Sequence, residues 1–367
     1  MISKNRRKFI KQMAIGSSGV LMSHNVFPNI IVNRPKDKIG VALLGLGYYS
    51  KNLLAPALKL TRHCELKGIV TGTPSKVAEW QEEYSIDDRN VYSYDTLDDI
   101  ANNPDIDVVY VVVPPFRHKE FTVRLANLGK HVWCEKPMAM TESECQVMID
   151  ECKKNKVNLS IGYRMQHEPN TRELIRMGKE QVFGAVKFVT ANAGFKASWT
   201  GWEDDWKMDK SKGGGALYDM GVYSLNAARY ATSEEPVAVL AQEFTDEPDR
   251  FSRADETTMF QLEFPSGAMA NCMTSFGMNI NELTVNAEKG WYRLEPFQSY
   301  SGVKGMTSKG TLIDLYIENQ QATQMDNDSL SIMRGTSMRV PGIEGLRDIR
   351  VVDAIHQSAT EGRRIII

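Results

Sequence analysis

Three residues of this chain have the types and the sequence context to move a proton: Lys136, Asp219 and Tyr223. Lys136 follows the apolar run 131–134 and precedes Pro137, which restricts the lysine to extended backbone geometry. We therefore expect Lys136 at the carboxyl end of a strand, the edge at which open parallel sheets bind ligands. The alternative is an ordinary strand-end lysine followed by a turn proline.

Asp219 and Tyr223 lie four residues apart in a segment that begins with the glycines 213–215. In a helix this spacing puts both side chains on one face, one turn apart. The pKa of a tyrosine is ordinarily about 10, so acid–base work near neutral pH needs a nearby cation, which Lys136 could supply. Taken alone, Tyr223 also fits the apolar side of an amphipathic helix, and Asp219 fits its solvated side.

A glycine turn follows the first long apolar run, residues 39–44, and precedes a helical stretch. In dinucleotide-binding folds the first glycine makes the turn, and the second lets the pyrophosphate approach the backbone at a helix N-terminus. The third position of this fingerprint is Ser50 here, rather than glycine or alanine. The pattern predicts a dinucleotide site that includes Gly45, Leu46, Gly47, Tyr48 and Tyr49.

The end of the second predicted strand indicates which dinucleotide binds. An acid at this position normally bonds the adenosine ribose of NAD, but residues 70–76 contain no carboxylate. Hydroxyl groups and a lysine suit a 2′-phosphate, because an anion requires donors and positive charge. We therefore favour NADP over NAD, with a site that includes Thr71, Gly72, Thr73 and Lys76. The alternative is that these hydroxyl residues make a turn and cap the next helix.

Strands and helices alternate from residue 38 to residue 163. The predicted strands are 39–44, 65–71, 108–113, 131–134 and 157–163, and the predicted helices are 51–60, 74–84, 119–128 and 142–154. Such alternation predicts an α/β domain with a doubly wound parallel sheet, the Rossmann arrangement.

After about residue 164 the pattern changes to helices followed by alternating strands separated by turn residues. The predicted helices are 170–179, 215–231 and about 346–360, and the predicted strands are 237–244, 257–264, 268–276, 282–287 and 291–295. This pattern predicts an α+β domain with a mostly antiparallel open sheet. We expect a Rossmann domain over 36–163 and a substrate and oligomerisation domain over 164–367, whose last helix is able to pack back on the first domain.

Composition and charge exclude several classes of protein. The net charge of −2 and a balanced content of acidic and basic residues give no indication of nucleic-acid binding. The five cysteines form no CxxC pair, so we expect buried thiols and no metal site.

The N-terminal 35 residues differ from the rest of the chain. The sequence from Asn5 to Lys11 contains a twin-arginine pattern, and a short apolar stretch follows at 13–22. This pattern is typical of signals that export folded proteins, which predicts a periplasmic location. The apolar stretch is too short for a standard membrane span. An uncleaved anchor and a basic disordered N-terminus are the alternatives.

Several of these motifs together resemble the Gfo/Idh/MocA oxidoreductase family, and within it the glucose–fructose oxidoreductases. The resemblance extends from residue 38 to the C-terminus. Tyrosine at position 223, where most of the family has histidine, marks the sugar oxidoreductase branch. The motifs are Gly45-Leu46-Gly47, Val70-Thr71-Gly72, Pro114-Pro115, Cys134 to Ala139, Ile161 to Arg164, Trp206-Lys207, Gly213 to Gly215, Asp219 to Tyr223 and Arg339 to Gly342.

The resemblance implies roles for individual residues. Lys136 and Tyr223 would form the proton-handling pair beside the nicotinamide, and Asp219 would contact substrate hydroxyls. Additional cofactor-binding residues would be Pro114, His118, Glu135, Lys136, Tyr163, Arg164 and Trp206. Lys207 stands where the most similar relatives have arginine. A homodimer or homotetramer is implied as well.

The sequence thus predicts an exported NADP-dependent oxidoreductase that acts on an aldose or a related cyclic polyol. The loop 197–212, with Trp199, Trp202 and Trp206, is expected to line the sugar site. One alternative is an NAD-dependent glycosidase of the same fold. A second alternative, from another class, is a non-catalytic protein that binds a sugar or a nucleotide.

Overall fold

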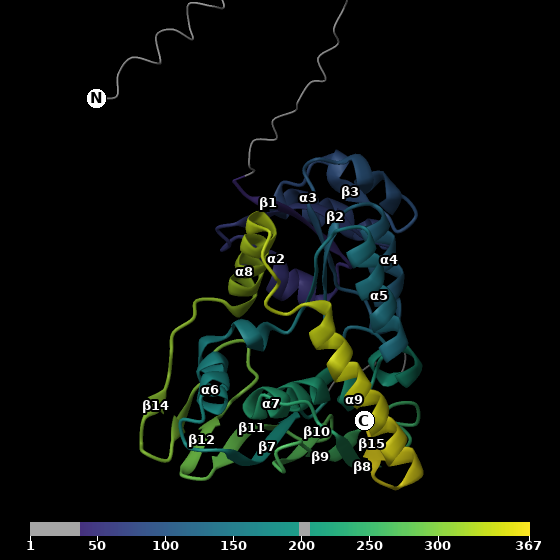
Figure 1. The fold of residues 1–367 in the computed structure, drawn as a ribbon. Helices are drawn as coiled ribbons and strands as arrows, with labels where there is room; N and C mark the ends of the chain where they lie inside the picture. The colour runs from purple at the N-terminus through teal and green to yellow at the C-terminus, as the bar shows by residue number, and fades with distance from the viewer. Residues whose placement is uncertain (1–36, 198–205) are drawn as a thin grey trace, which may run out of the picture. The chain divides into compact units, whose positions relative to one another are not determined.

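The computed structural model of the chain describes residues 37–197 and 206–367. The predicted export signal at residues 1–35 lies outside these ranges, as do Trp199 and Trp202. The described residues contain two β-sheets, the first formed by residues 39–161 and the second by residues 186–366 (Figure 1).

The first sheet has six parallel strands in the order β3-β2-β1-β4-β5-β6. This order confirms the predicted doubly wound Rossmann arrangement. The strands are β1 (Ile39–Leu44), β2 (Cys64–Val70), β3 (Val91–Tyr92), β4 (Val108–Val111), β5 (His131–Cys134) and β6 (Leu159–Ile161).

Helices bury both faces of this sheet, which explains why its strands are continuously apolar. Alternate residues of β1 belong to two separate cores, with Val41 and Leu43 in one and Ala42 and Leu44 in the other. The first core is completed by side chains of α2 (Ala55–Leu58), α3 (Val77–Tyr84) and α8 (Gln320–Arg334). The second is completed by α4 (His118–Asn127) and α5 (Glu142–Lys154).

The second sheet has nine strands in the order β14-β13-β12-β11-β7-β10-β9-β8-β15. All neighbouring pairs are antiparallel except β7 and β10, so the predicted mostly antiparallel sheet is confirmed. The strands are β7 (Val186–Gly194), β8 (Ala238–Phe244), β9 (Thr257–Glu263), β10 (Met269–Ser275), β11 (Ile280–Ala287), β12 (Gly290–Leu294), β13 (Gly305–Thr307), β14 (Leu312–Ile313) and β15 (Ile365–Ile366).

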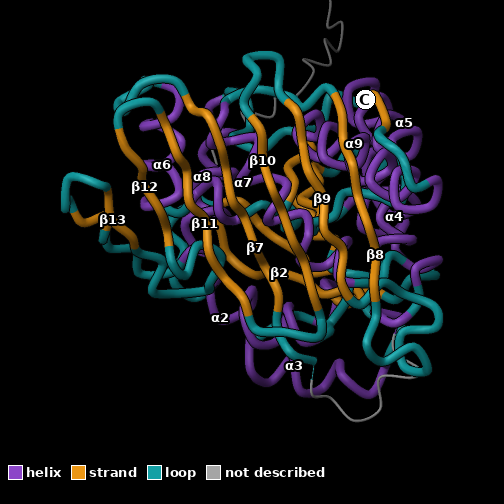
Figure 2. Tube along the Cα trace, turned by 90° about the horizontal axis from the view of Figure 1, so that it is seen from below, coloured by secondary structure: helices purple, strands orange, loops and turns teal. Residues whose placement is uncertain are grey.

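Helices pack against one face of the second sheet, and Figure 2 shows the opposite face turned to the viewer. They are α6 (Pro169–Lys179), α7 (Val222–Thr232) and α9 (Gly342–Glu361). α7 contacts β7 and β10, and α9 contacts β8. α9 also packs on α5 of the first half, where Arg350 Nε donates to Glu142 Oε1 at 2.9 Å.

Two segments differ from the predicted helices, and several elements were not predicted: β7, α8 and the short strands β3, β13, β14 and β15. The predicted helix 51–60 is a π-helical turn, Ser50–Leu54, followed by α2, and the helix predicted from residue 215 begins as a π-helical turn over Leu217–Gly221. β7 and α8 were missed entirely, although β7 is central to its sheet. α8 was missed because it is largely polar, and it lies beside α2 on the first sheet (Figure 1).

All five cysteines are buried and unpaired, as predicted. Within the described ranges, no group of three histidine, cysteine or acidic side chains could hold a metal ion. The same ranges contain no helix long and apolar enough to cross a membrane.

Candidate active site

Lys136 joins the two halves of the fold. It follows β5 at the carboxyl edge of the first sheet, and its Nζ donates to the backbone oxygen of Asp219 at 2.6 Å and to Asp219 Oδ1 at 3.1 Å. Asp219 lies in the π-helical turn before α7, and both side chains are largely buried, with 12% and 19% exposed. The structure therefore brings together two residues that are 83 positions apart.

Tyr223 completes this cluster. The Nζ of Lys136 lies 4.8 Å from the centroid of the Tyr223 ring, and the tyrosine is buried at the start of α7. Lys207 Nζ reaches the other carboxylate oxygen of Asp219 at 3.2 Å. The predicted residues Lys136, Asp219 and Tyr223 are thus adjacent in the structure, and Lys207 belongs to the same cluster.

The charges in this cluster are mutually stabilised. Burial opposes ionisation of Asp219, but Lys207 and Lys136 outweigh it and hold the pKa of Asp219 below its ordinary value. Burial likewise opposes the charge on Lys136, but Tyr223, Asp219 and Glu135 raise the pKa of Lys136 above its ordinary value. At neutral pH the pair is therefore a carboxylate and an ammonium.

Glu135 holds the backbone of Lys136 in place through a hydrogen bond. Its Oε2 accepts from the backbone N–H of Lys136 at 3.1 Å, and its Oε1 accepts from the hydroxyl of Tyr110 at 2.7 Å. Gln324 of α8 donates to the same hydroxyl at 3.1 Å. Burial raises the pKa of Glu135, although Tyr110, Lys136 and Arg164 oppose the rise. Glu135, predicted as a cofactor contact, is thus bound within the protein.

His118 and Pro114 also belong to this edge of the sheet. The ring nitrogens of His118 contact the backbone oxygens of Pro137 at 2.9 Å and Val113 at 2.8 Å, so the imidazole braces the segment after Lys136. Pro114 precedes a short 3₁₀ turn that leads into α4. Trp206 begins another 3₁₀ turn, and Lys207 Nζ lies 5.9 Å from its ring.

The glycine turn after β1 has the shape that a dinucleotide requires. Gly45 has φ of +94°, and a Cβ there would lie 2.2 Å from the oxygen of Val112, so only glycine fits. A Cβ on Gly47 would meet no atom within 4 Å, which leaves the backbone open to a pyrophosphate. Ser50, the departure from the fingerprint, donates to the backbone oxygen of Gly45 at 2.5 Å and tightens the turn.

The predicted 2′-phosphate residues follow β2. The N–H of Thr73 donates to Thr71 Oγ1 at 3.0 Å, which forms the turn that the sequence offered as an alternative role. Lys76 Nζ donates to the backbone oxygen of Leu46 at 2.8 Å and links this segment to the glycine turn. Hydroxyl groups, a lysine and an open glycine turn therefore meet at one edge, a donor set that fits NADP.

Arg164 lies beside Tyr223, in the 3₁₀ turn after β6. Its guanidinium carbon is 5.3 Å from the Tyr223 ring centroid and 4.5 Å from that of Tyr300. Its Nη1 donates to the backbone oxygen of Ser299 at 2.8 Å and to the side chain of Gln320. Tyr300 and Gln320 were not predicted, because they follow no periodic pattern and lie far from the motifs.

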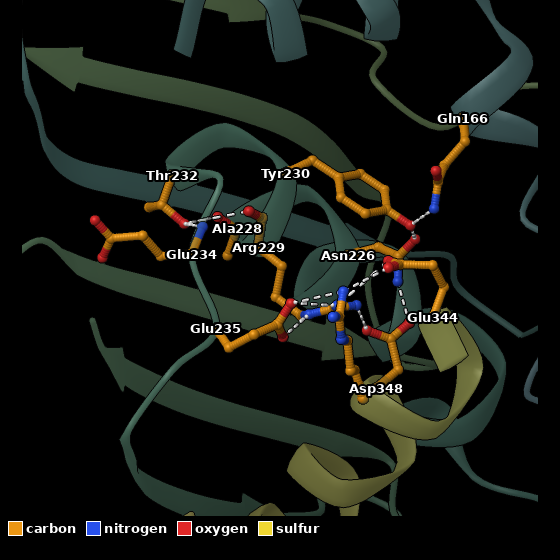
Figure 3. A network of polar contacts seen from close by, with 11 residues as sticks. Gln166, Asn226, Ala228, Arg229, Tyr230, Thr232, Glu234, Glu235, Glu344 and Asp348 are labelled. Atoms are coloured by element: carbon orange, nitrogen blue, oxygen red, sulfur yellow. Dashed lines mark hydrogen bonds and ion pairs between the residues drawn. The ribbon is translucent and has the colours of Figure 1, made fainter. Parts of the chain in front are cut away.

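A network of polar contacts joins α7 to α9 and to the turn that contains Gln166 (Figure 3). Gln166, two residues after Arg164, donates to Tyr230, and Tyr230 donates to Asn226. Asn226 and Arg229 both donate to Asp348 of α9, and Arg229 also pairs with two glutamates, Glu235 and Glu344. Burial raises the pKa of Asp348 to about 6, with Arg229 opposing the rise.

Comparison with known proteins identifies both halves of the chain. Residues 39–163 match the model of an oxidoreductase family with an NAD-binding Rossmann fold, and residues 171–293 match the GFO/IDH/MocA C-terminal domain. The structure resembles the crystal structure of aldose-aldose oxidoreductase from Caulobacter crescentus complexed with glycerol. The two are 41% identical, the match covers 90% of this chain and 100% of that one, and the TM-score is 0.86.

Two curated proteins are similar over most of their length. D-xylose 1-dehydrogenase [NADP(+)] from Haloarcula marismortui is 27% identical over 88% of this chain and 91% of its own. D-glucoside 3-dehydrogenase from Escherichia coli is 25% identical over 89% of this chain and 96% of its own.

Proposed function

This chain belongs to the Gfo/Idh/MocA oxidoreductase family, and we propose that it transfers hydride between a nicotinamide cofactor and an aldose or related cyclic polyol. The observation that carries the proposal is the contact of Lys136 with Asp219 and with the ring of Tyr223. This cluster lies at the carboxyl edge of the sheet that also carries the open glycine turn. The names of the relatives, two sugar dehydrogenases and an aldose-aldose oxidoreductase, support a sugar substrate.

In the proposed reaction the protein's own groups handle the proton. Tyr223 accepts the proton of the substrate hydroxyl during oxidation and returns it during reduction. Lys136, 4.8 Å from the ring, stabilises the negative charge that the tyrosine oxygen carries before it accepts the proton in oxidation and after it donates the proton in reduction. Asp219, held as a carboxylate by two lysines, accepts a hydrogen bond from a second substrate hydroxyl and fixes the orientation of the sugar. A bound nicotinamide would supply or accept the hydride.

We infer that the cofactor is NADP. The stretch after β2 carries Lys76 and hydroxyl groups and no carboxylate, and two relatives are named as NADP-dependent xylose dehydrogenases. Purified protein is therefore expected to release NADP(H) when it is denatured. If it purifies without nucleotide, titration should give a Kd for NADP at least about tenfold below that for NAD. Release of NAD, or a lower Kd for NAD, would contradict this inference.

The test of the function is a screen of aldoses and polyols for a change in nicotinamide absorbance, followed by Tyr223→Phe. The variant is expected to lose about 10²–10⁴-fold in kcat, because the phenylalanine cannot carry the proton, while it still binds nucleotide. Tyr218→Phe is the matched control. Tyr218 lies in the π-helical turn that directly precedes α7, but its hydroxyl donates to the backbone oxygen of Met140. Full activity of Tyr223→Phe would refute the mechanism.

The same assays separate the alternatives. Release of an aglycone with no net change in nicotinamide absorbance would instead identify an NAD-dependent glycosidase. Binding of nucleotide and sugar without turnover of any aldose would indicate a non-catalytic binding protein.

We also propose that the chain is exported in folded form, on the basis of the twin arginines Arg6 and Arg7. Cell fractionation should find the protein in the periplasm, and replacement of both arginines with lysine should retain it in the cytoplasm. An unchanged distribution of the double variant would rule out this route.

A further inference from the structure

Arg164 is a buried cation whose direct partners are neutral. Only 2% of the residue is exposed. Its hydrogen bonds go to the backbone oxygen of Ser299, the amide oxygen of Gln320 and the sulfur of Met165. Among the described residues no carboxylate lies within ion-pair distance, and its Nε has no hydrogen-bond partner. A buried charge held in this way is costly, so its retention calls for a functional explanation.

The neighbours of the guanidinium suggest that function. Arg164 lies between the rings of Tyr300 and Tyr223, at 4.5 Å and 5.3 Å from the two centroids. Lys136 approaches the Tyr223 ring at 4.8 Å. Tyr223 therefore has two cations near its ring, and they come from separate segments of the chain. Asp219 pairs with Lys136, but in the described ranges no carboxylate pairs with Arg164.

We propose that Arg164 is a second cationic group of the reaction centre, a positioning residue that stabilises the ionised form of Tyr223, which accepts the proton in oxidation and is left after proton donation in reduction. The inference rests on the proposed function, since it assigns a partner to the proton-transferring tyrosine. Lys136 is partly neutralised by its ion pair with Asp219, whereas Arg164 forms no ion pair with a described carboxylate and is attracted only at longer range by Glu135. Although burial opposes its charge, Tyr223, Tyr49 and Tyr300 raise the pKa of Arg164, so it stays charged.

Gln320 is a neutral side chain in direct contact with this charge. It lies on α8 with no exposed surface, and its amide oxygen accepts from Arg164 while its Nε2 has no partner among the described residues. A glutamate at position 320 would keep an oxygen that accepts from Arg164. It would lose no hydrogen bond of the amide nitrogen, because that nitrogen has no partner among the described residues. It would, however, give Arg164 the carboxylate that it lacks. Gln320→Glu therefore tests the effect of the charge of Arg164 while the arginine side chain keeps its position.

The decisive experiment compares the kinetics of Gln320→Glu with those of the wild type. If Arg164 acts through its charge, kcat is expected to fall about tenfold. The pH at which the oxidation rate is half-maximal should rise by about one unit. With less positive charge nearby, the reacting group loses its proton only at a higher pH than in the wild type. The KM for sugar and the Kd for NADP should stay within about twofold. If Arg164 has only a structural role, the new ion pair should leave both kcat and the pH profile unchanged.

Several charged or titratable groups lie around Tyr223 in the described part of the chain, and the pH profile depends on all of them. These groups are Lys136, Glu135, Asp219, Lys207, Arg164, Tyr49 and Tyr300.

Two further variants cover the remaining outcomes. Arg164→Gly is expected to lose about 100-fold in kcat and to recover part of it when guanidinium ion is added, even if Gln320→Glu folds poorly. Gln320→Glu in a Tyr223→Phe background should have no additional effect, because the charge that Arg164 stabilises is then never formed. Loss of NADP binding in Arg164→Gly without a change in kcat at saturation would instead assign Arg164 to the cofactor and overturn the proposal. An active Tyr223→Phe would refute the proposed function itself, whatever the Arg164 variants show.

Discussion

Asp219 lies between two lysines, and this arrangement determines the charge of the reaction centre. Its two carboxylate oxygens contact Lys136 and Lys207, so one negative charge faces two positive ones. In many proteins the free-energy cost of removing charged groups from water exceeds the stabilisation that their ion pairs provide. We therefore interpret the cluster as an arrangement for chemistry, in which a net positive charge remains beside Tyr223.

A buried aspartate on α8 makes a prediction about pH. Asp328 accepts from Ser160 Oγ at 2.8 Å through one oxygen, and its other oxygen has no partner among the described residues. Burial raises the pKa of Asp328 from 3.8 to about 7, although Ser160 opposes the rise. Between about pH 4 and pH 7 the folded protein therefore binds more protons at this site than the unfolded chain, and stability falls as pH rises.

Asp328→Asn removes that dependence, because an amide is neutral at every pH. At pH 8 the free energy of unfolding is expected to increase by at most about 4 kcal/mol, at 1.36 kcal/mol per pH unit, and the gain should disappear toward pH 4. Urea denaturation at several pH values measures it. The control is Asp326→Ala on the same helix, which removes an acceptor of the backbone N–H groups of Arg62 and His63 and should destabilise the protein. A pH-independent effect of Asp328→Asn would contradict the prediction.

The reacting residues could be predicted from sequence, but their supporting residues could not. Lys136, Asp219 and Tyr223 stand in motifs whose backbone context can be recognised. Gln320 and Tyr300 belong to no motif, and only the folding of α8 and the loop after β12 brings them to Arg164. Contacts of this kind depend on three-dimensional structure rather than on local pattern.

At the level of elements, periodicity was reliable wherever one face of an element is apolar. Five of the six strands of the first sheet and α5 match their predictions because their buried positions are hydrophobic, whereas the two-residue strand β3 was not predicted. α8 gave no such pattern, since its buried positions include Gln320, Gln324 and Asp328, which make polar contacts with the first half. The π-helical turn at 217–221 was also unpredictable, because local sequence gives no indication of an inserted residue.

The network that fixes α7 should be important for stability. Arg229 is buried and contacts Asp348, which has no exposed surface, so Arg229→Met leaves a buried carboxylate without its cation. We expect a loss of about 3 kcal/mol in the free energy of unfolding. Arg347 offers a matched control, because it pairs with the same two glutamates, Glu235 and Glu344, from an exposed position. Arg347→Met should cost less than about 1 kcal/mol. Equal losses by urea denaturation would refute the assignment.

At the scale of the molecule, one face of the second sheet is not covered by the described helices. The described helices that pack on this sheet lie against its other face (Figure 2). The uncovered face presents exposed apolar side chains from three strands: Phe188 of β7, Leu240 of β8 and Met259 of β9. Exposed apolar residues that gather on one face are typical of protein–protein contacts.

We therefore expect the chain to form a homodimer or homotetramer through this face. A stable interface needs about 800 Å² from each partner, and two charges at its centre should prevent it. Phe188→Glu combined with Met259→Glu is expected to give a monomer by light scattering, with kcat per chain preserved because α7 and Tyr223 lie on the opposite face. Val147→Glu, at an equally exposed apolar position on α5, should leave the mass unchanged. A wild-type monomer at about 50 μM, or a double variant of unchanged oligomeric mass, would show that association does not use this face.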